Sequence, residues 1–434
     1  MKYIIIGAGP GGYELAAMLS RQSHDVTLVE RDRLGGTCLN RGCIPTKVMA
    51  HAASLARSAA AASDYGIGLT VTGIDFSALR RRRDVIVDTL RQNVGMLLSG
   101  VNVVIGDARF VAPMTVEVNG ESMTADRIVI ATGSSAASLP VPGASEAVSS
   151  DGLLSLEALP DSLAIIGGGV IGLEFASIFS ALGSRVTVIE YFKEVLPQFD
   201  KDMAKRLRMS MTSAGVTFVT GAEVTAIEHG AVRYRAGTKE GVVEASVTAM
   251  AVGRRPNLPG GLEVAGVETD RGAITVDPRT MRTSAPGIYA IGDVNGICML
   301  AHAASAQARI VAGEDVVASV VPSVVFTSPE ASMVGMTEQQ CKEAGIACRT
   351  GKVPFRGNGK AVTVGETDGM VKLIAEAETG NILGCQIVGP HAADLIEEVA
   401  VAMANGLTAA ALTRTIHPHP TLCEAIQAAA MMLK

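Results

Sequence analysis

The chain has 434 residues, of which 48% are hydrophobic and 18% are charged, and its net charge is −6. This length and composition predict about two to four globular domains, each able to bury a core, and exclude a disordered protein. The acidic balance and the absence of Trp argue against a nucleic-acid partner.

The cysteines and the apolar runs indicate where the protein is found. Seven cysteines without framework spacing indicate a reducing compartment. The apolar run after Lys2 ends at Gly7 and is too short for a signal peptide. The run from Val316 to Phe326 is about half the ~20 residues that span a bilayer. We therefore expect a cytoplasmic protein with no membrane partner, and we interpret the basic run at residues 80–83 as a solvated helix face.

The N-terminus has the pattern of a βαβ unit that binds a dinucleotide. Gly7 allows a tight turn, Gly9 lets backbone amides approach a pyrophosphate, and Gly12 lets the helix pack on the strand. Glu30 stands at the end of the second strand, where a ribose-binding acid is expected. The expected elements are a strand at residues 3–6, a helix from 13 to about 21, and a strand at 26–29.

Two cysteines with four residues between them come after this unit. Cys38 and Cys43 stand in a Gly-rich turn that runs into a helical pattern, so Cys43 is expected near a helix N-terminus, where the dipole favours a thiolate. A thiolate attacks disulfides, and a neighbouring thiol resolves the mixed disulfide. Two unrelated thiols and a structural zinc half-site are the alternatives. No second Cys/His pair is present at short spacing, so the pattern favours a redox pair and no metal.

Strand-like runs at residues 101–105, 115–118 and 127–130 are interpreted as a meander. They end at Ala131-Thr132-Gly133, where the backbone can return close to the first glycine turn. The sequence Pro-Val-Pro-Gly at residues 140–143 is interpreted as a linker into the next domain.

The first unit then occurs a second time. Gly167, Gly169, Gly172 and Glu190 repeat Gly7, Gly9, Gly12 and Glu30 at one constant offset, with a strand at 163–166, a helix at 173–182 and a strand at 185–189. Four positions in a fixed register predict two dinucleotide sites, and electrons passing between two dinucleotides is the economical interpretation. Two packing turns without ligands are the alternative.

The chain order assigns the two cofactors. A disulfide must touch the carrier that reduces it, so the site that precedes the cysteines is expected to hold the flavin, FAD, and the second site the nicotinamide. Glu190 can accept hydrogen bonds from both ribose hydroxyls and would repel a 2′-phosphate, which favours NAD over NADP.

The remainder completes an α/β protein with two Rossmann-like dinucleotide-binding domains and a C-terminal α+β domain. Asp293 ends a strand and could reach a polyol hydroxyl, cap the next helix, or do both. The expected divisions are residues 1–145 for the first part of the FAD domain, 146–262 for the NAD domain, 263–318 for a return to the FAD domain, and 319–434 for the C-terminal domain.

A His–Glu pair stands near the C-terminus. His419 and Glu424 could form a base and its orienting carboxylate, because a thiol–disulfide reaction needs a group that accepts a thiol proton. Thr421 and Glu424 also have the spacing of a helix capping box. Spacing alone does not separate these interpretations.

Together these motifs resemble the pyridine nucleotide-disulfide oxidoreductases over essentially the whole chain, and among them the dihydrolipoyl dehydrogenases most closely. The resemblance rests on residues 35–47, 167–174, 253–256, 292–293, 326–330, 334–335, 337–338 and 417–424. It implies oxidation of a dihydrolipoyl group, with NAD⁺ as the final acceptor. It also implies a homodimer formed by the C-terminal domain, and as partner the lipoyl domain of a 2-oxoacid dehydrogenase complex or of a glycine cleavage carrier protein.

The resemblance also implies residue roles. Cys38 would be the interchange thiol and Cys43 the charge-transfer thiol against the flavin. Lys47 would sit near the flavin N5 and pair with Glu174. His419 would be the acid–base residue, held by Glu424 and supplied across the dimer. The implied cofactor-binding residues are Gly7, Gly9, Gly12, Glu30, Gly36, Thr37, Lys47, Ala131, Thr132, Gly133, Gly167, Gly169, Gly172, Glu190, Gly253 and Asp293.

Some positions depart from the family pattern, and other activities compete with the one it implies. Pro418, Cys423, Gln307, Ala308 and Glu14 differ from the usual residues without removing a catalytic group. A glutathione-type reductase shares the fold but would need basic residues at the end of the second ribose-binding strand. Mercuric and large thioredoxin reductases would need a C-terminal cysteine pair. A flavin-bearing scaffold without turnover predicts loss of a catalytic residue.

Overall fold

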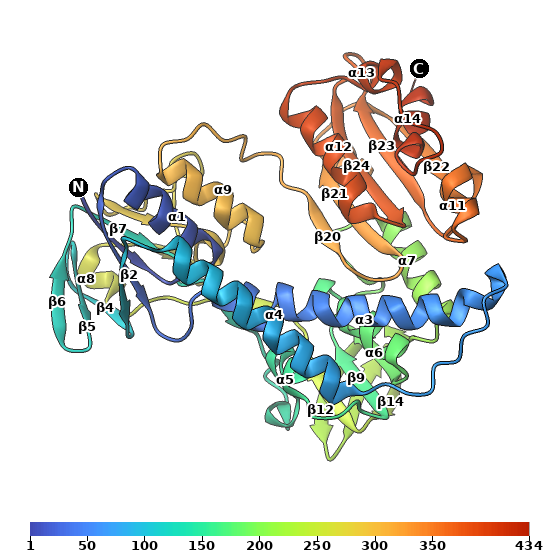
Figure 1. Ribbon diagram of the computed structural model, residues 1–434, viewed down its shortest axis with the longest axis horizontal. Coiled ribbons are helices and arrows are strands. Elements are labelled where there is room, and N and C mark those ends of the chain that lie inside the picture. Colours follow the sequence, from blue (N-terminus) through green and yellow to red (C-terminus); the bar gives the residue numbers. More distant parts are fainter. Residues whose placement is uncertain (434) are drawn as a thin grey trace. The chain divides into compact units, whose positions relative to one another are not determined.

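A computed structural model describes residues 1–433 and divides the chain into two compact units (Figure 1). The first unit comprises residues 1–48, 77–137 and 254–318, and the second comprises residues 49–76, 138–253 and those from 319 onward. Each unit therefore consists of segments far apart in the sequence. No helix in the described chain is long and apolar enough to cross a membrane.

The first unit is built on a five-stranded parallel sheet in the order β19-β7-β1-β2-β3. The side chains of Ile4 and Ile5 are fully buried on opposite faces, as expected for a central strand covered on both sides. Helices α1 and α9 pack on each other beside the sheet (Figure 1). The elements are β1 (Lys2–Ile6), α1 (Pro10–Arg21), β2 (Asp25–Glu30), β3 (Asn102–Ile105), β7 (Arg127–Ile130), β19 (Ile288–Ala290) and α9 (Ala301–Val311).

The predicted meander is wrong in its membership. Strands β3 and β7, predicted as its first and last members, belong to the parallel sheet. The antiparallel meander consists of β4 (Ala108–Ala112), β5 (Thr115–Val118) and β6 (Glu121–Thr124). A four-residue apolar run fits a parallel or an antiparallel ladder equally well, so its pattern did not identify its partner.

The second unit contains a four-stranded parallel sheet in the order β11-β10-β9-β15. The segment predicted as a linker is packed against this part of the chain, because the Ile227 N–H donates to the Pro142 carbonyl at 2.9 Å. A Cβ at Gly143 would overlap the Ile227 carbonyl, so only glycine fits there. The elements are β9 (Ser162–Ile166), α6 (Val170–Leu182), β10 (Arg185–Glu190), α7 (Lys201–Ser213), β11 (Thr217–Thr220), β12 (Ala222–Glu228), β13 (Ala231–Ala236), β14 (Lys239–Glu244) and β15 (Val247–Met250).

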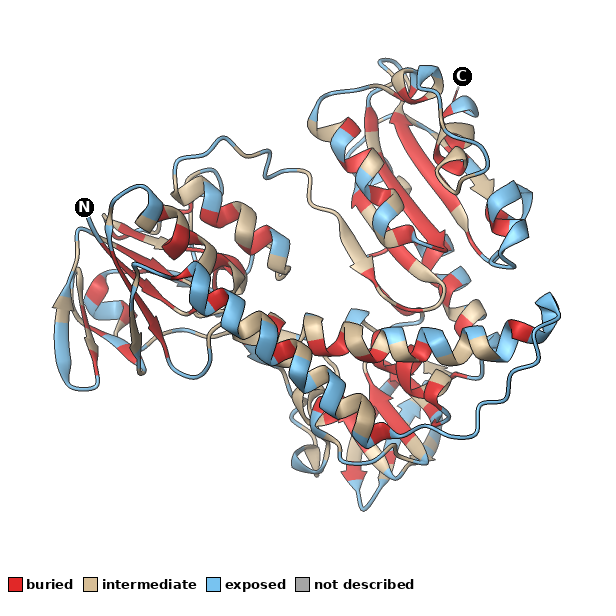
Figure 2. Ribbon diagram, in the orientation of Figure 1, coloured by how far each residue is buried: buried red, intermediate tan, exposed pale blue. Residues whose placement is uncertain are grey.

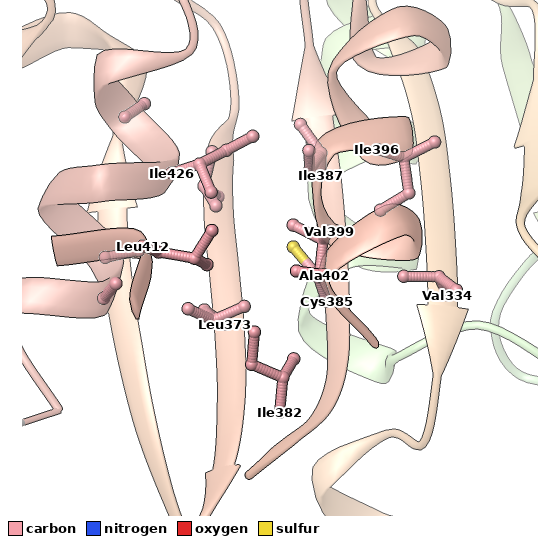
Figure 3. Packing of buried hydrophobic residues seen from close by; sticks show 14 of the residues in the cluster. Val334, Leu373, Ile382, Cys385, Ile387, Ile396, Val399, Ala402, Leu412 and Ile426 are labelled. Carbon is pink, nitrogen blue, oxygen red and sulfur yellow. The ribbon is translucent and has the colours of Figure 1, made fainter. Parts of the chain in front are cut away.

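The C-terminal part of this unit has the predicted α+β character. Its five-stranded sheet is antiparallel, in the order β20-β21-β24-β23-β22. Figure 2 shows the central strands β23 and β24 of this sheet largely buried, and Figure 3 shows side chains of α12, α13 and α14 gathered around Leu373 and Cys385. The elements are β20 (Ser323–Val325), β21 (Glu330–Gly335), β22 (Cys348–Pro354), β23 (Met370–Glu376), β24 (Ile382–Gly389), α12 (Ala392–Ala404), α13 (Ala409–Arg414) and α14 (Glu424–Met431).

The chain also contains the long helix α4 (Phe76–Leu97). Shorter elements are β8 (Ser134–Ala136), α5 (Ser150–Ser155), β16 (Arg254–Pro256), α8 (Leu262–Ala265), β17 (Thr269–Asp270), β18 (Ala273–Ile274), α10 (Glu338–Glu343), α11 (Gly359–Thr363) and the 3₁₀ turns at 62–65, 144–146, 292–295 and 355–357.

Candidate active site

The first glycine turn has the geometry of a pyrophosphate cradle. Gly7 has φ +105°, and a Cβ there would overlap the Ala131 carbonyl oxygen. A Cβ at Gly12 would overlap the carbonyl oxygen of Gly7, whereas one at Gly9 would meet nothing within 4 Å. Gly9 is also the N-cap of α1 and provides no side-chain cap. The open space in front of uncapped helix amides fits a dinucleotide phosphate.

The second glycine turn repeats these features in the second unit. Gly167 has φ +109°, and a Cβ there would overlap the Ala251 carbonyl oxygen. A Cβ at Gly172 would overlap the Gly167 carbonyl, and one at Gly169 would meet nothing within 4 Å. Gly169 is the N-cap of α6, again without a side-chain cap. Both turns therefore fit a dinucleotide.

The acids that end β2 and β10 also organise the turns. The Glu30 carboxylate accepts the Ala8 N–H at 2.8 Å and the Asp32 N–H at 2.9 Å. The Glu190 carboxylate accepts the N–H groups of Gly168 at 2.5 Å and Phe192 at 2.8 Å. Each oxygen that accepts one N–H keeps a further lone pair. Both acids can therefore still accept a ribose hydroxyl, but they also hold the glycine turn, a role that the sequence pattern did not reveal.

The two cysteines lie directly beside the first glycine turn. The prediction of a turn at Cys38 is wrong, because Cys38 lies in the short helix α2 (Gly36–Arg41). Cys43 is the first residue of α3 (Cys43–Ala61), as predicted. The Gly35 N–H donates to the Ala8 carbonyl at 2.8 Å. A Cβ at Gly36 would lie 2.6 Å from the Gly9 Cα, so the backbones touch and glycine is required.

The cysteine thiols contact each other. Hydrogen bonding of the two thiols, together with burial of Cys38, raises the pKa of Cys38 well above its usual range. Cys43 is exposed and Cys38 is half-buried. The structure thus holds a dithiol at the N-terminus of α3, next to the first glycine turn. Of the remaining residues predicted for this site, Thr37 lies on α2 and Lys47 on α3.

Asp293 belongs to a polar cluster in the same unit and does not cap a helix. Its carboxylate accepts a short hydrogen bond from the Ser134 hydroxyl and lies 3.8 Å from the Arg254 Nε. Arg254 in turn donates to the Ser134 hydroxyl at 2.7 Å. The turn that carries Asp293 is held by Gln307, which is buried and accepts the Gly292 N–H at 2.7 Å. Gln307, which departs from the family pattern, therefore serves a local structural need.

Ser134 and Arg254 were not among the predicted site residues. They are far from Asp293 in the sequence, and only the neighbouring Gly-Arg-Arg-Pro motif gave a signal. The predicted Ala131-Thr132-Gly133 segment does return to the glycine turn: the Ala131 N–H donates to the Ile6 carbonyl at 2.8 Å. Asn257 holds this segment by donating from its side chain to the Thr132 carbonyl at 3.2 Å.

The remaining predicted residues lie in the second unit. Glu174 is buried on α6 and accepts the Phe326 N–H at 3.0 Å. Gly253 has φ +111°, where a Cβ would meet nothing within 4 Å. Lys47 is in the first unit and Glu174 in the second. Their pairing stays a prediction.

The His–Glu end combines both interpretations of its sequence. The His419 Nδ1 lies 2.9 Å from Glu424 Oε1, and Glu424 Oε2 accepts the Thr421 N–H at 2.8 Å. The Thr421 hydroxyl donates to the Pro418 carbonyl at 2.6 Å instead of capping α14, so only half of a capping box forms. Hydrogen bonds from Thr421 and His419 lower the pKa of Glu424.

This geometry identifies the ring nitrogen of His419 that donates to Glu424. Because the Glu424 carboxylate is ionised at neutral pH, it can only accept, so Nδ1 of His419 carries the hydrogen of this bond. The other ring nitrogen, Nε2, is then free to take up or release a proton. The His419 side chain is 77% exposed, so within one chain it is presented outward.

The fold and these sites define a class of protein: an oxidoreductase with two dinucleotide sites and a dithiol. Comparison with known proteins agrees. The profile of the pyridine nucleotide-disulphide oxidoreductase family matches residues 1–308, and that of the family's dimerisation domain matches residues 321–430. The chain belongs to this family, as its motifs indicated. It is an oxidoreductase that uses FAD and NAD.

Individual relatives give a finer comparison. A dihydrolipoyl dehydrogenase of Thermus scotoductus is 41% identical over 447 residues, covering 99% of this chain and 96% of that one. The dihydrolipoyl dehydrogenase of Chlamydia pneumoniae is 40% identical, covering 97% and 94%. Among solved structures, LpdA from Mycobacterium tuberculosis superposes with a TM-score of 0.90 at 31% identity. The HOCl-induced flavoprotein disulfide reductase RclA from Escherichia coli gives 0.89 at 30%; both matches cover 100% of each chain.

Proposed function

We propose that the chain is a dihydrolipoyl dehydrogenase, which oxidises protein-bound dihydrolipoamide and passes the electrons to NAD⁺. Full-length relatives of this name at about 40% identity support the activity. The His419–Glu424 pair, with its available Nε2, supports thiol–disulfide chemistry in general, and the buried Glu190 carboxylate, which disfavours NADP, is the observation that favours a dihydrolipoyl dehydrogenase over a glutathione-type reductase. A reductase that delivers electrons to a disulfide and an enzyme that withdraws them from a dithiol both need a base for the substrate thiol.

The catalytic residues divide the work between them. With the Cys38–Cys43 pair oxidised, a dihydrolipoyl thiol gives its proton to Nε2 of His419, and its sulfur attacks Cys38, which releases Cys43 as a thiolate and leaves a mixed disulfide. The second dihydrolipoyl thiol then attacks the lipoyl sulfur of this mixed disulfide and displaces Cys38, which takes up a proton; lipoamide leaves, and both cysteines are reduced. Glu424 stabilises the imidazolium that forms. When bound next to the dithiol, FAD would supply the two-electron acceptor for these cysteines, and NAD⁺ would be the final acceptor.

The cofactor sites are proposed residue by residue. The amides at Gly9 and Gly36 would hold the FAD pyrophosphate, Asp293 would bind the ribityl hydroxyls, and Glu30 would bind the ribose. The amides at Gly169 would hold NAD, and the buried Glu190 carboxylate would repel a 2′-phosphate. Domain boundaries near residues 145, 262 and 318 are part of the same proposal.

We further propose a cytoplasmic homodimer that serves a lipoyl domain of a 2-oxoacid dehydrogenase complex or of a glycine cleavage carrier protein. The match to the dimerisation domain supports the dimer. Within it, Ile416, which is 94% exposed beside the His419 segment, is a side chain that the partner chain would cover. Sedimentation of the purified protein at two concentrations tests the dimer.

One activity panel tests the function. NAD⁺ and NADP⁺ are each crossed with dihydrolipoamide and with glutathione, and the reverse reactions with lipoamide and glutathione disulfide. We expect turnover only for the NAD–lipoamide combination. Higher activity with glutathione disulfide would favour the glutathione-reductase-like alternative, and equal activity with both nucleotides would remove the role given to Glu190.

A mixing experiment tests where the base acts. Each single variant, Cys38→Ser and His419→Gln, should lose about 10²-fold or more of the dihydrolipoamide activity. When the two proteins are dissociated and reassociated together, activity should return, because one site per heterodimer has both a wild-type dithiol and a wild-type base. Inactive heterodimers would mean that His419 acts within its own chain or is not the base.

A further inference from the structure

A second pair of cysteines lies outside the catalytic residues, in the C-terminal part of the chain. Cys341 is the one buried residue of helix α10 (Glu338–Glu343) and has no exposed surface. Cys348 is the first residue of β22, the edge strand of the antiparallel sheet, and is half-buried. One thiol is therefore shielded by the protein, and its neighbour is reached from solvent.

The chain reverses between these cysteines in a defined way. The Ile346 N–H donates to the Cys341 carbonyl at 2.9 Å, and the Gly345 N–H donates to the Lys342 carbonyl at 3.2 Å. Gly345 has φ +70°. This pair of bonds with a left-handed glycine is the Schellman helix ending. It turns the backbone after α10 and brings Cys348 back beside Cys341.

Helix α10 packs against β22 at this reversal, so the two thiols are neighbours. Burial, together with the neighbouring Cys348 thiol, raises the pKa of Cys341 to about 11. Cys341 is therefore a thiol at neutral pH, which suits a group that reacts second. Cys38 and Cys43 show the same arrangement: two neighbouring thiols, with one cysteine on a short helix and the other at the first residue of the next element.

We propose that Cys341 and Cys348 are a second redox-active pair, which closes to an intrachain disulfide when the protein meets a peroxide. The Cys348 sulfur attacks hydrogen peroxide and becomes a sulfenic acid, and water leaves. The Cys341 sulfur then attacks the sulfenic sulfur, its proton leaves with the hydroxyl as a second water, and the disulfide forms. Two thiols and one peroxide thus give one disulfide and two waters.

The pair joins two elements that belong to a buried ion cluster. Glu338, on the same helix as Cys341, lies 2.8 Å from the ammonium of Lys372. Lys372 is buried on β23, the strand next to β22. A disulfide between α10 and β22 would therefore restrict the helix that carries one carboxylate of this cluster. Formation of the Cys341–Cys348 disulfide would also protect Cys348 from oxidation beyond the sulfenic acid.

Peptide mapping of the full-length holoenzyme tests the proposal with an internal standard. Lys342 separates Cys341 from Cys348 for trypsin, and Arg41 separates Cys38 from Cys43, so each disulfide gives one linked pair of peptides. After hydrogen peroxide, alkylation and digestion without reductant, we expect both linked pairs. If the active-site pair is linked while Cys341 and Cys348 are both alkylated, the proposal is overturned.

A trapping experiment distinguishes a true pair from two independent thiols. In Cys341→Ser, the sulfenic acid on Cys348 has no resolving thiol, so labelling of Cys348 by dimedone should rise roughly tenfold over the wild type. Cys298→Ser, which removes another half-buried thiol, is the matched control and should leave this labelling unchanged. Equal labelling in the wild type and in Cys341→Ser would show that Cys341 does not resolve Cys348. Cys348→Ser should keep its lipoamide activity.

Discussion

The two glycine turns, at residues 7–12 and 167–172, have nearly the same local structure, but the segments that follow them differ. Gly7 and Gly167 share a positive φ within a few degrees, and Glu30 and Glu190 bind backbone amides at corresponding positions. After Glu30 the chain passes through two glycines into the dithiol. After Glu190 it leads to Asp200 and helix α7, with no thiol.

The contrast teaches how one scaffold serves two tasks. In the first turn, Gly36 approaches Gly9 backbone to backbone, which places a reactive pair beside the cofactor cradle. In the second, the Asp200 carboxylate caps α7 by accepting from Asp202 and lies 2.6 Å from the buried Lys372 ammonium. The segment after Glu30 therefore carries the reactive cysteines. The segment after Glu190 instead pairs with the C-terminal sheet through Asp200 and Lys372.

The largest expected effect comes from breaking the ion cluster that Lys372 forms with Asp200 and Glu338. Burial lowers the pKa of Lys372, but hydrogen bonds with Asp200 and Glu338 outweigh it and raise the pKa overall. Lys372→Met would remove the ammonium between these two carboxylates, so we expect a loss of about 3–5 kcal/mol in the free energy of unfolding. Urea denaturation followed by circular dichroism measures it.

A nearby lysine provides the control for this prediction. Lys352 lies 3.3 Å from Asp202, but its side chain is 41% exposed. Lys352→Met should therefore cost about 1 kcal/mol or less. FAD should stay bound in both variants, because the first turn does not depend on this cluster. Equal losses in the two variants would mean that burial of the ammonium is not what matters.

The next effect tests whether the two turns are equivalent. A Cβ at Gly12 or Gly172 would overlap a backbone carbonyl, which cannot move aside as a side chain can. We expect each alanine variant to lose about 3 kcal/mol of stability in its own unit. Gly12→Ala should lose bound FAD, whereas Gly172→Ala should keep the yellow colour and lose reduction by NADH.

Gly9→Ala and Gly169→Ala are the matched controls, since a Cβ there meets nothing within 4 Å. These proteins should fold as the wild type does and lose only cofactor affinity, because the methyl group occupies the cradle. A melting temperature depressed as far as in the Gly12 and Gly172 variants would show that the open space is not a ligand site.

A smaller effect is expected from the paired acids. Gln at position 30 or 190 keeps one acceptor oxygen and turns an NH₂ toward a backbone N–H. Each substitution should weaken binding of the corresponding nucleotide by about 1–3 kcal/mol. Glu30→Gln should weaken FAD binding, and Glu190→Gln should weaken NAD binding and reduce the discrimination against NADP. Titration with each nucleotide measures both, and an unchanged NAD/NADP ratio in Glu190→Gln would contradict the assignment.

Local chemistry explains which parts of the molecule could be predicted from its sequence. The glycines at positions 7, 9 and 12 are required by the conformation of a single turn, so their spacing carries the information. The start of α3 at Cys43 and the contact of His419 with Glu424 depend on a few consecutive residues. The glycine turn and the start of α3 were predicted correctly because they do not require knowledge of distant parts of the chain, and the His419–Glu424 contact was one of two interpretations that the sequence left open.

The features that were missed depend on distant partners. Asp200 and Lys372 are 172 residues apart, and Ser134 reaches Arg254 from 120 residues away. The partner of a four-residue strand such as β3 is likewise set by the whole sheet. The Thr421–Glu424 spacing was ambiguous for another reason: both interpretations use the same carboxylate, and the structure satisfies one oxygen with each.

The smallest expected effect is the pH dependence of the stability that the Glu338–Lys372 ion pair contributes. The hydrogen bond from the Lys372 ammonium lowers the pKa of Glu338 below its ordinary value of 4.5. Above that value Glu338 is ionised in the folded and unfolded states, and its contribution to stability is complete. As the pH falls through the lowered pKa, the folded protein must take up the proton and the contribution disappears. Because the Glu338 side chain is 47% exposed, we expect this ion pair to contribute about 1 kcal/mol or less to the free energy of unfolding.

The melting temperatures of the wild type and Glu338→Gln should therefore differ at pH 7 and converge toward pH 3. Glu343→Gln, on the same helix but bonded to Gln339, should show no such convergence. A Glu338→Gln difference that stays constant from pH 7 to pH 3 would show that its ion pair with Lys372 does not stabilise the fold.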